Sequence, residues 1–239
     1  MMHSNTILTE PVVAAQLSPV QAGIIADVIL KLNGIVAMAS ADFSFVGSLL
    51  KTRSDPSGRN WVSPIVTELQ YIDILKQKVD HMIGFLEDIN LPFDLIGFCE
   101  KETDRPGTWG LVFKLNFLQL NVAQSDFVKS VESIQSKLRE GKNQGDTASE
   151  FNIEPEIVCK NFKVIVESMD DVSRSLARLS EEYPATPGVR ALSIVHHLLK
   201  QYTMESEREV LRWCMDQLEG KFAGQLKIDD LKEDQIQLF

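Results

Sequence analysis

Apolar residues recur every three or four positions along most of this chain. Because an α-helix has 3.6 residues per turn, this spacing places them on one face of a helix. Runs that alternate apolar and polar residues between turn signals are missing, so no strand is predicted. The pattern predicts five helices, over the ranges Ser18–Lys51, Val62–Ile89, Thr108–Leu138, Glu154–Glu182 and Gly188–Leu218.

Segments without this periodicity separate the predicted helices. Residues 52–60, "TRSDPSGRN", contain Ser, Asp, Pro, Gly and Asn and no apolar residue, which is typical of a loop. Residues 139–150, "REGKNQGDTASE", are predicted to be a linker. Leu95–Cys99 is a short apolar segment between two breaks in the pattern.

The length of these helices indicates how they assemble. A helix of about 30 residues is ~45 Å long and must bury its apolar stripe against neighbouring helices. The predicted fold is therefore all-α, an elongated antiparallel bundle of about five helices, with a four-helix core and an extra N-terminal helix. We expect residues 1–222 to form this single domain and residues 223–239 to form an acidic, apolar tail.

The charge balance excludes some partners. The 239 residues include 34 acidic and 24 basic side chains, which gives a formal net charge of −10. A nucleic-acid backbone would be repelled by this surface on average, so nucleic acid is not an expected partner. Binding to another protein through a local patch of complementary charge remains open.

Cysteine usage and the N-terminus bear on the compartment. Cys99, Cys159 and Cys214 are an odd number of widely spaced residues without a CxxC pair, so neither a disulfide framework nor a zinc site is indicated. There is no signal-peptide pattern and no continuous run of about 18 apolar residues. We expect a cytoplasmic protein that does not insert into a membrane.

One predicted helix carries a line of polar side chains within the stretch "LQYIDILKQKVDHM". Gln70, Asp73, Gln77 and His81 are spaced by three and four residues, so they share one side of the helix. On spacing alone, these residues could form an ordinary solvated helix edge.

This stretch resembles the helix of the CheZ family of chemotaxis phosphatases. In that family an Asp and a Gln four residues apart insert into the active site of the phosphorylated response regulator CheY. Asp73 and Gln77 match that pair in spacing and order, and they follow Gln70 in "LQYIDILKQ". The resemblance covers about 20 residues, and the order of helices around the pair differs from that of CheZ.

The resemblance implies a phospho-aspartate phosphatase, with Gln77 and Asp73 as its catalytic residues. The Gln77 amide would hold a water in line with the phosphorylated aspartate of the partner, and Asp73 would pair with a lysine of the partner. An amide suits this task because it accepts and donates hydrogen bonds without adding charge beside a phosphoryl group. The chain would need no cofactor of its own, since Mg²⁺ is expected on the CheY-like partner.

Partner contacts are expected at two places. Gln70 and His81 flank the catalytic pair on the predicted helix. The tail ends "IDDLKEDQIQLF", which resembles the CheZ tail in being acidic and apolar and in ending with Phe. A short terminal segment without a binding role is the alternative. The predicted partner-binding residues of the tail are Leu231, Ile236, Leu238 and Phe239.

Two other functions remain open. His197 in "HHLLKQ" is similar to the histidine of phosphotransfer bundles, although Gln201 replaces the usual glycine. The long helices could also serve a non-enzymatic interaction protein, because heptad-like stripes can bury a homodimer as readily as a core. A metal site is not predicted, since none of the four histidines follows a Glu by three positions.

Overall fold

The structure is a computed structural model, and it describes residues 17–52, 62–90, 105–144, 160–183 and 204–219. These residues are 95% helical and include no strand, which confirms the predicted all-α bundle. The helices are α1 (Pro19–Thr52), α2 (Val62–Leu69), α3 (Tyr71–Asn90), α4 (Arg105–Gln144), α5 (Phe162–Glu182) and α7 (Glu205–Glu219).

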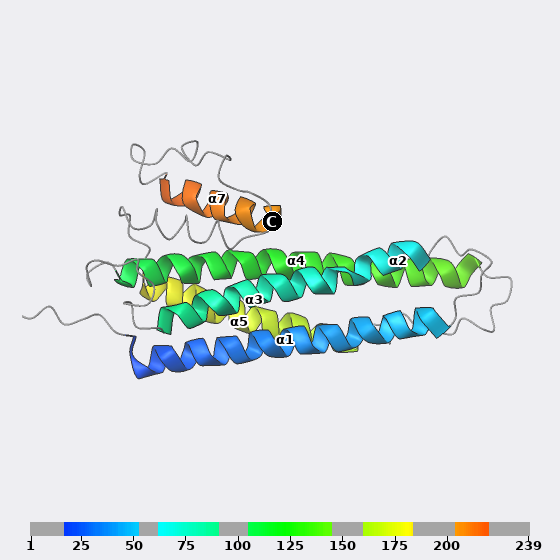
Figure 1. Cartoon of the computed structure of the whole chain (residues 1–239), viewed down its shortest axis with the longest axis horizontal. Coiled ribbons are helices and arrows are strands. Elements are labelled where there is room, and N and C mark those ends of the chain that lie inside the picture. The colour runs from blue at the N-terminus through cyan, green and yellow to red at the C-terminus, as the bar shows by residue number, and fades with distance from the viewer. Residues whose placement is uncertain (1–16, 53–61, 91–104, 145–159, 184–203, 220–239) are drawn as a thin grey trace, which may run out of the picture.

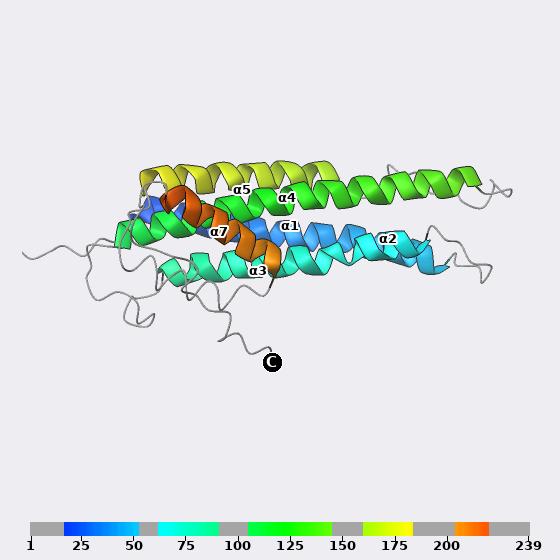
Figure 2. The same ribbon diagram turned by 90° about the horizontal axis from the view of Figure 1, so that it is seen from above.

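Four long rods form the bundle, and successive rods run in opposite directions (Figure 1). α2 and α3 lie end to end and together make the second rod. α1 packs on α3 and α5, and α4 packs on the same two helices from the opposite side, so α1 and α4 lie diagonally across the bundle. α7 crosses over the outside of α4, as the view from above shows (Figure 2).

One continuous apolar core holds the rods together. The inner side of α1 contributes Ile25, Val28, Leu32 and Ile35, all with no exposed surface. Further along the bundle, aromatic rings from three helices stack in series, with Phe127 of α4 between Phe43 of α1 and Phe162 of α5. The ring centroids are 6.0 Å and 5.9 Å apart, which lies in the range favoured by aromatic pairs.

The helix outside the four-helix core lies at the opposite end of the chain from the predicted one. The sequence pattern predicted that the N-terminal helix would lie outside the four-helix core. In the structure α1 is a full member of the core, and α7 is the described helix outside it. The reason is that α1 buries a complete stripe of large aliphatic residues between α3 and α5. α7 has only 15 residues, and it packs mainly on α4.

The predicted helix Val62–Ile89 is interrupted at Gln70. The Gln70 N–H donates to the Thr67 carbonyl at 3.2 Å, and the Asp73 N–H donates to the Gln70 carbonyl at 3.1 Å. Both bonds span three residues, as in a tightened helical turn. The Glu68 carbonyl, which a continuous helix would use internally, instead accepts a hydrogen bond from the Ser130 hydroxyl of α4.

α4 is longer than predicted. The sequence placed a linker from Arg139, whereas the helix continues through Gln144, so the prediction was wrong for residues 139–144. A glycine inside a helix costs only about 1 kcal/mol. The single Gly141 therefore does not end a helix that is already propagating.

Two other predicted helices have non-helical residues where their described part begins. Lys160 and Asn161 form a turn, and α5 starts at Phe162. The Asp42 carboxylate of α1 accepts hydrogen bonds from the backbone N–H and the side-chain amide of Asn161, which holds this residue outside the helix. Residues 188–203 of the last predicted helix, Gly188–Leu218, lie outside the described part, and Met204 forms a bend directly before α7 begins at Glu205.

α1 also stands out by its length and its apolar composition. Among the described residues, Pro19–Lys51 is the one helical stretch long and apolar enough to cross a membrane by length and composition. The core helix of a soluble bundle passes the same test. Removal of α1 from the bundle would expose the faces of α3 and α5 on which it packs.

Candidate functional site

The predicted polar line lies where α2 meets α3. Gln70 and Asp73 are exposed, Gln77 is partly exposed, and the side chain of His81 is 21% exposed. The structure therefore brings Gln70, Asp73 and Gln77 to the surface on one side of the second rod. His81 is turned toward the body of the protein.

Asp73 occupies the first turn of α3. Unpaired backbone N–H groups give a helix N-terminus a partial positive charge, which stabilises a nearby carboxylate. The tight turn at Gln70 creates this N-terminus in the middle of a long rod. The exposed Asp73 carboxylate therefore lies where the helix N-terminus favours a negative charge.

Two exposed apolar residues flank the polar line. Val66 is 46% exposed and Ile74 is 40% exposed. We refer to Val66, Gln70, Asp73, Ile74 and Gln77 as the docking face, since steps of three and four residues place them on one side of α2 and α3. Exposed apolar side chains beside hydrogen-bonding groups are typical of protein-binding surfaces.

Behind the docking face, two side chains fasten α3 to α4. Lys78 is almost fully buried, and its Nζ lies 3.3 Å from Oδ2 of Asp126. The Tyr71 hydroxyl donates to the Ala123 carbonyl at 2.8 Å. Burial raises the pKa of Tyr71 well above its usual value, and the nearby Asp126 carboxylate raises it further. The docking face therefore rests on a firmly attached helix.

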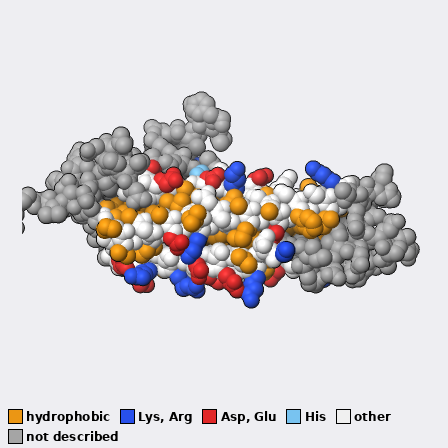
Figure 3. Space-filling model, turned by 90° about the horizontal axis from the view of Figure 1, so that it is seen from below, with side chains coloured by type: hydrophobic (Ala, Val, Ile, Leu, Met, Phe, Trp, Pro, Cys, Tyr) orange, Lys and Arg blue, Asp and Glu red, His pale blue; other side chains and the backbone are white. Residues whose placement is uncertain are grey.

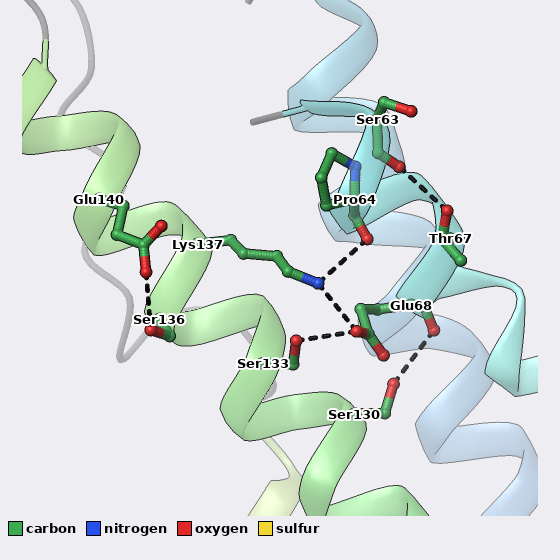
Figure 4. Close-up of polar contacts among 9 residues, drawn as sticks. All are labelled: Ser63, Pro64, Thr67, Glu68, Ser130, Ser133, Ser136, Lys137 and Glu140. Carbon is green, nitrogen blue, oxygen red and sulfur yellow. Dashed lines mark hydrogen bonds and ion pairs between the residues drawn. The ribbon is translucent and has the colours of Figure 1, made fainter. Parts of the chain in front are cut away.

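α2 is fastened to α4 by a polar cluster around Glu68, shown in Figure 4. Its Oε1 accepts hydrogen bonds from Lys137 Nζ and from the Ser133 hydroxyl, both at 2.8 Å. Burial acts to raise the pKa of Glu68, but the bonds from Lys137 and Ser133 outweigh it and lower the pKa. Lys137 Nζ also lies 3.4 Å from the Pro64 carbonyl.

His81 connects α3 to α7. Its Nδ1 lies 2.7 Å from Oε1 of Glu207, whose side chain is 1% exposed. Next to this pair, the Gln119 amide of α4 donates to the Glu207 carbonyl at 3.0 Å. Glu207 Oε2 and Gln119 Oε1 are buried without a hydrogen-bond partner in the described structure. His81, the fourth residue of the polar line, thus has a partner within its own chain.

Several predicted residues fall outside the described residues, namely Leu231, Ile236, Leu238, Phe239, His197, Cys99 and Cys159. The expectations for the tail and for histidine phosphotransfer therefore stay predictions. In the part of the chain that the structure describes, no three His, Cys, Asp or Glu side chains gather as they would around a metal ion.

The sequence analysis missed the apolar part of the docking face and the link to α7. Val66 belongs to the apolar periodicity that predicts the helix Val62–Ile89, and only the tertiary packing shows that Ile65 is the buried neighbour while Val66 is exposed. Glu207 gave no signal, because a Glu in the first turn of a helix is common on the surface. Its burial depends on where α7 crosses α3 and α4.

Comparison with known protein families, with curated proteins and with solved structures gives no match to this chain.

Proposed function

We propose that this protein binds a phosphorylated response regulator through the docking face and accelerates hydrolysis of its phospho-aspartate. The observation that carries the proposal is that Asp73 is exposed and Gln77 partly exposed on an otherwise well-packed helix, beside the exposed apolar residues Val66 and Ile74. The protein would act in the cytoplasm, where such regulators occur.

In this mechanism Gln77 orients the attacking water. The water oxygen bonds to phosphorus as the bond from phosphorus to the aspartate oxygen breaks, which releases inorganic phosphate and restores the carboxylate of the partner. The partner's Mg²⁺ neutralises the developing charge. Gln77 contributes by position rather than by proton affinity, because an amide does not ionise.

Asp73 would hold the partner in register. Its carboxylate lies one turn before Gln77 on the same side of α3, so it can pair with a lysine beside the regulator's phosphorylation site. Val66 and Ile74 would supply apolar contact around these polar groups. The exposed carboxylate needs little desolvation before the partner arrives.

The test is release of phosphate from a response regulator phosphorylated with acetyl phosphate in the presence of Mg²⁺. Catalytic amounts of the full chain should accelerate the release, and Gln77→Ala should remove the acceleration while binding persists. Glu87→Gln, at another exposed position of α3, is the matched control. If no cognate regulator loses phosphate faster with the wild-type chain, the catalytic proposal fails.

A second candidate is binding without catalysis. The apolar residues Val66 and Ile74 favour it, because contact with a partner would bury them whether or not a reaction follows. The same experiment separates the two functions. If Ile74→Lys weakens binding and the wild-type protein does not change the rate of phosphate release, the result would support a protein that binds without catalysis.

A further inference from the structure

α1 carries a second seam on the side that faces away from the core. Its members alternate steps of three and four residues, as in the heptad pattern that brings two helices together. The inner stripe of α1, at Ile25, Val28, Leu32 and Ile35, follows the same rule five positions later, so the two seams lie on roughly opposite sides of the helix. The outer seam consists of Val20, Gly23, Asp27, Leu30, Gly34, Ala37, Ala41, Ser44 and Ser48, with Phe45 beside it.

This outer seam is apolar for most of its length. Between Lys31 and Lys51 the one charged residue is Asp42, which is buried on the inner side and bonded to Asn161. Two polar side chains on the outer side hydrogen-bond to their own helix, Asn33 to the Ile29 carbonyl at 3.0 Å and Ser48 to the Ser44 carbonyl at 2.9 Å. Covering this surface therefore leaves few polar groups in need of new partners.

No described helix covers the outer seam. α7 lies on the opposite side of the bundle, across α4 (Figure 1). Leu30 is 71% exposed and Phe45 is 46% exposed. A methyl group added at Gly34 would meet nothing within 4 Å. Seen from below, apolar side chains extend along the exposed side of the bundle, with charged side chains along its edge (Figure 3).

The middle of the seam has pairs of positions that are symmetric about the point between Ala37 and Met38. Leu30 and Phe45 lie equally far from this point, and so do Gly34 and Ala41. In an antiparallel pair of identical helices, Leu30 of one copy would face Phe45 of the other, with small residues between them. Small residues allow two helix backbones to approach closely, and a two-fold axis makes such a contact self-complementary.

Charge also favours a second copy in this orientation. The chain carries a net charge of −10, so two copies repel each other except where a surface lacks charge. Asp27 is paired with Lys31 of its own helix at 2.9 Å, and antiparallel pairing brings this carboxylate to within a turn of Lys51 of the other copy. Parallel pairing would instead place each of these charges beside its own kind.

We propose that two copies of this chain pair antiparallel through the outer seam of α1. This interface is independent of the docking face, which lies on α2 and α3, so a dimer would present two docking faces. The inner stripe of α1 stabilises each bundle and the outer seam joins the two bundles.

The first test is the molar mass of the full chain by light scattering, which should be twice 26.9 kDa. Leu30→Lys and Phe45→Lys place a charge in the seam at exposed positions, and each should raise the dissociation constant at least tenfold with unchanged circular dichroism. Val164→Lys is the matched control, because Val164 is a 49% exposed apolar residue on α5. A monomer at 100 µM, or a dimer that both seam variants leave intact, would overturn the proposal.

Cysteine crosslinking tests the orientation. Leu30→Cys and Phe45→Cys proteins should form disulfide-linked dimers when mixed, and each alone should crosslink no more than the wild type with its three natural cysteines. The two positions are 15 residues apart, about 22 Å along a helix, so self-linkage of Leu30→Cys would indicate parallel pairing and contradict the proposal. Flotation of the wild type, but not of Leu30→Lys, with phosphatidylcholine vesicles would assign the seam to a membrane instead.

Discussion

Nδ1 of His81 lies 2.7 Å from Oε1 of Glu207, and this contact joins the second rod of the bundle to the helix that crosses it. Glu207 is almost fully buried, so the contact is shielded from water. His81 lies one turn beyond Gln77 on α3. The position of α7 beside the docking face therefore depends on a residue of the same polar line.

The first prediction concerns this contact. His81→Ala would leave the buried Glu207 carboxylate without its partner, and we expect the free energy of unfolding to fall by about 3 kcal/mol. Glu207→Gln should cost less, about 1 kcal/mol, because a neutral amide can still accept a hydrogen bond from the imidazole. Urea denaturation measures both values.

The comparison variant is Lys163→Ala, which removes an exposed ion pair with Glu167 and should change stability by less than about 0.5 kcal/mol. Amide exchange in α7 should accelerate in His81→Ala. Equal effects of His81→Ala and Lys163→Ala would show that the contact between His81 and Glu207 contributes little.

The second prediction concerns pH and Glu68. Its pKa is lower in the folded chain than its ordinary value of 4.5, so the folded state binds the proton less tightly than the unfolded state. The stabilisation is therefore complete above about pH 4.5 and is lost as the pH falls through the folded pKa.

Glu68→Gln removes this titration. The variant should be less stable than the wild type by about 1 kcal/mol at pH 7, and the difference should shrink at low pH. Unfolding by urea at several pH values between 7 and 3 measures the difference. A difference that is constant over this range would contradict the assignment. Ser136→Ala is the control. It removes a nearby hydroxyl that donates to Glu140 of its own helix, and its effect on stability should show no such pH dependence.

The third prediction concerns Tyr71, whose hydroxyl bonds to the Ala123 carbonyl. Tyr71→Phe should lower the free energy of unfolding by about 1 kcal/mol at neutral pH, because one hydrogen bond to α4 is lost. The pKa of Tyr71 is raised in the folded chain, so its contribution is complete below the unfolded pKa of 10.0 and is lost at higher pH.

Tyr71→Phe should accordingly be less sensitive to base than the wild type above about pH 10. Thermal melting at pH 8 and pH 10.5 makes the comparison. If both proteins lose the same amount of stability between these two pH values, the hydroxyl is not held in its protonated form by the fold.

The fourth prediction concerns the docking face. Ile74→Lys should weaken binding to a response regulator at least tenfold with little effect on stability, because Ile74 is 40% exposed and its replacement leaves no cavity in the core. Val164→Lys, at an equally exposed position on α5, should leave binding unchanged. Titration calorimetry measures the affinity, and equal binding by both variants would locate the partner elsewhere.

Much of the fold could be predicted from local pattern. The repeat of apolar residues at Ile25, Val28, Leu32 and Ile35 is a property of the α1 sequence, and the structure buries all four. The pattern in α5 likewise predicted the burial of Met169, Val172 and Leu176. These agreements arise because a long helix in water must bury its apolar stripe, whichever helix covers it.

Two of the errors arose where one element acts on another. The break at Gln70 depends on the Ser130 hydroxyl taking the Glu68 carbonyl, and Ser130 is 62 residues away in the chain. The start of α5 at Phe162 depends on Asp42, which is 119 residues from Asn161. Helical periodicity contains no information about such contacts.

The sequence by itself determined that this protein is all-α, that its helices are long, and that Gln70, Asp73 and Gln77 share one side of a helix. Only the tertiary structure decided that Val66 and Ile74 are exposed beside them, that His81 is engaged by Glu207, and that α1 has an uncovered seam. The physical reason is that spacing places a residue on a side of its helix, whereas burial depends on which other helix packs against that side.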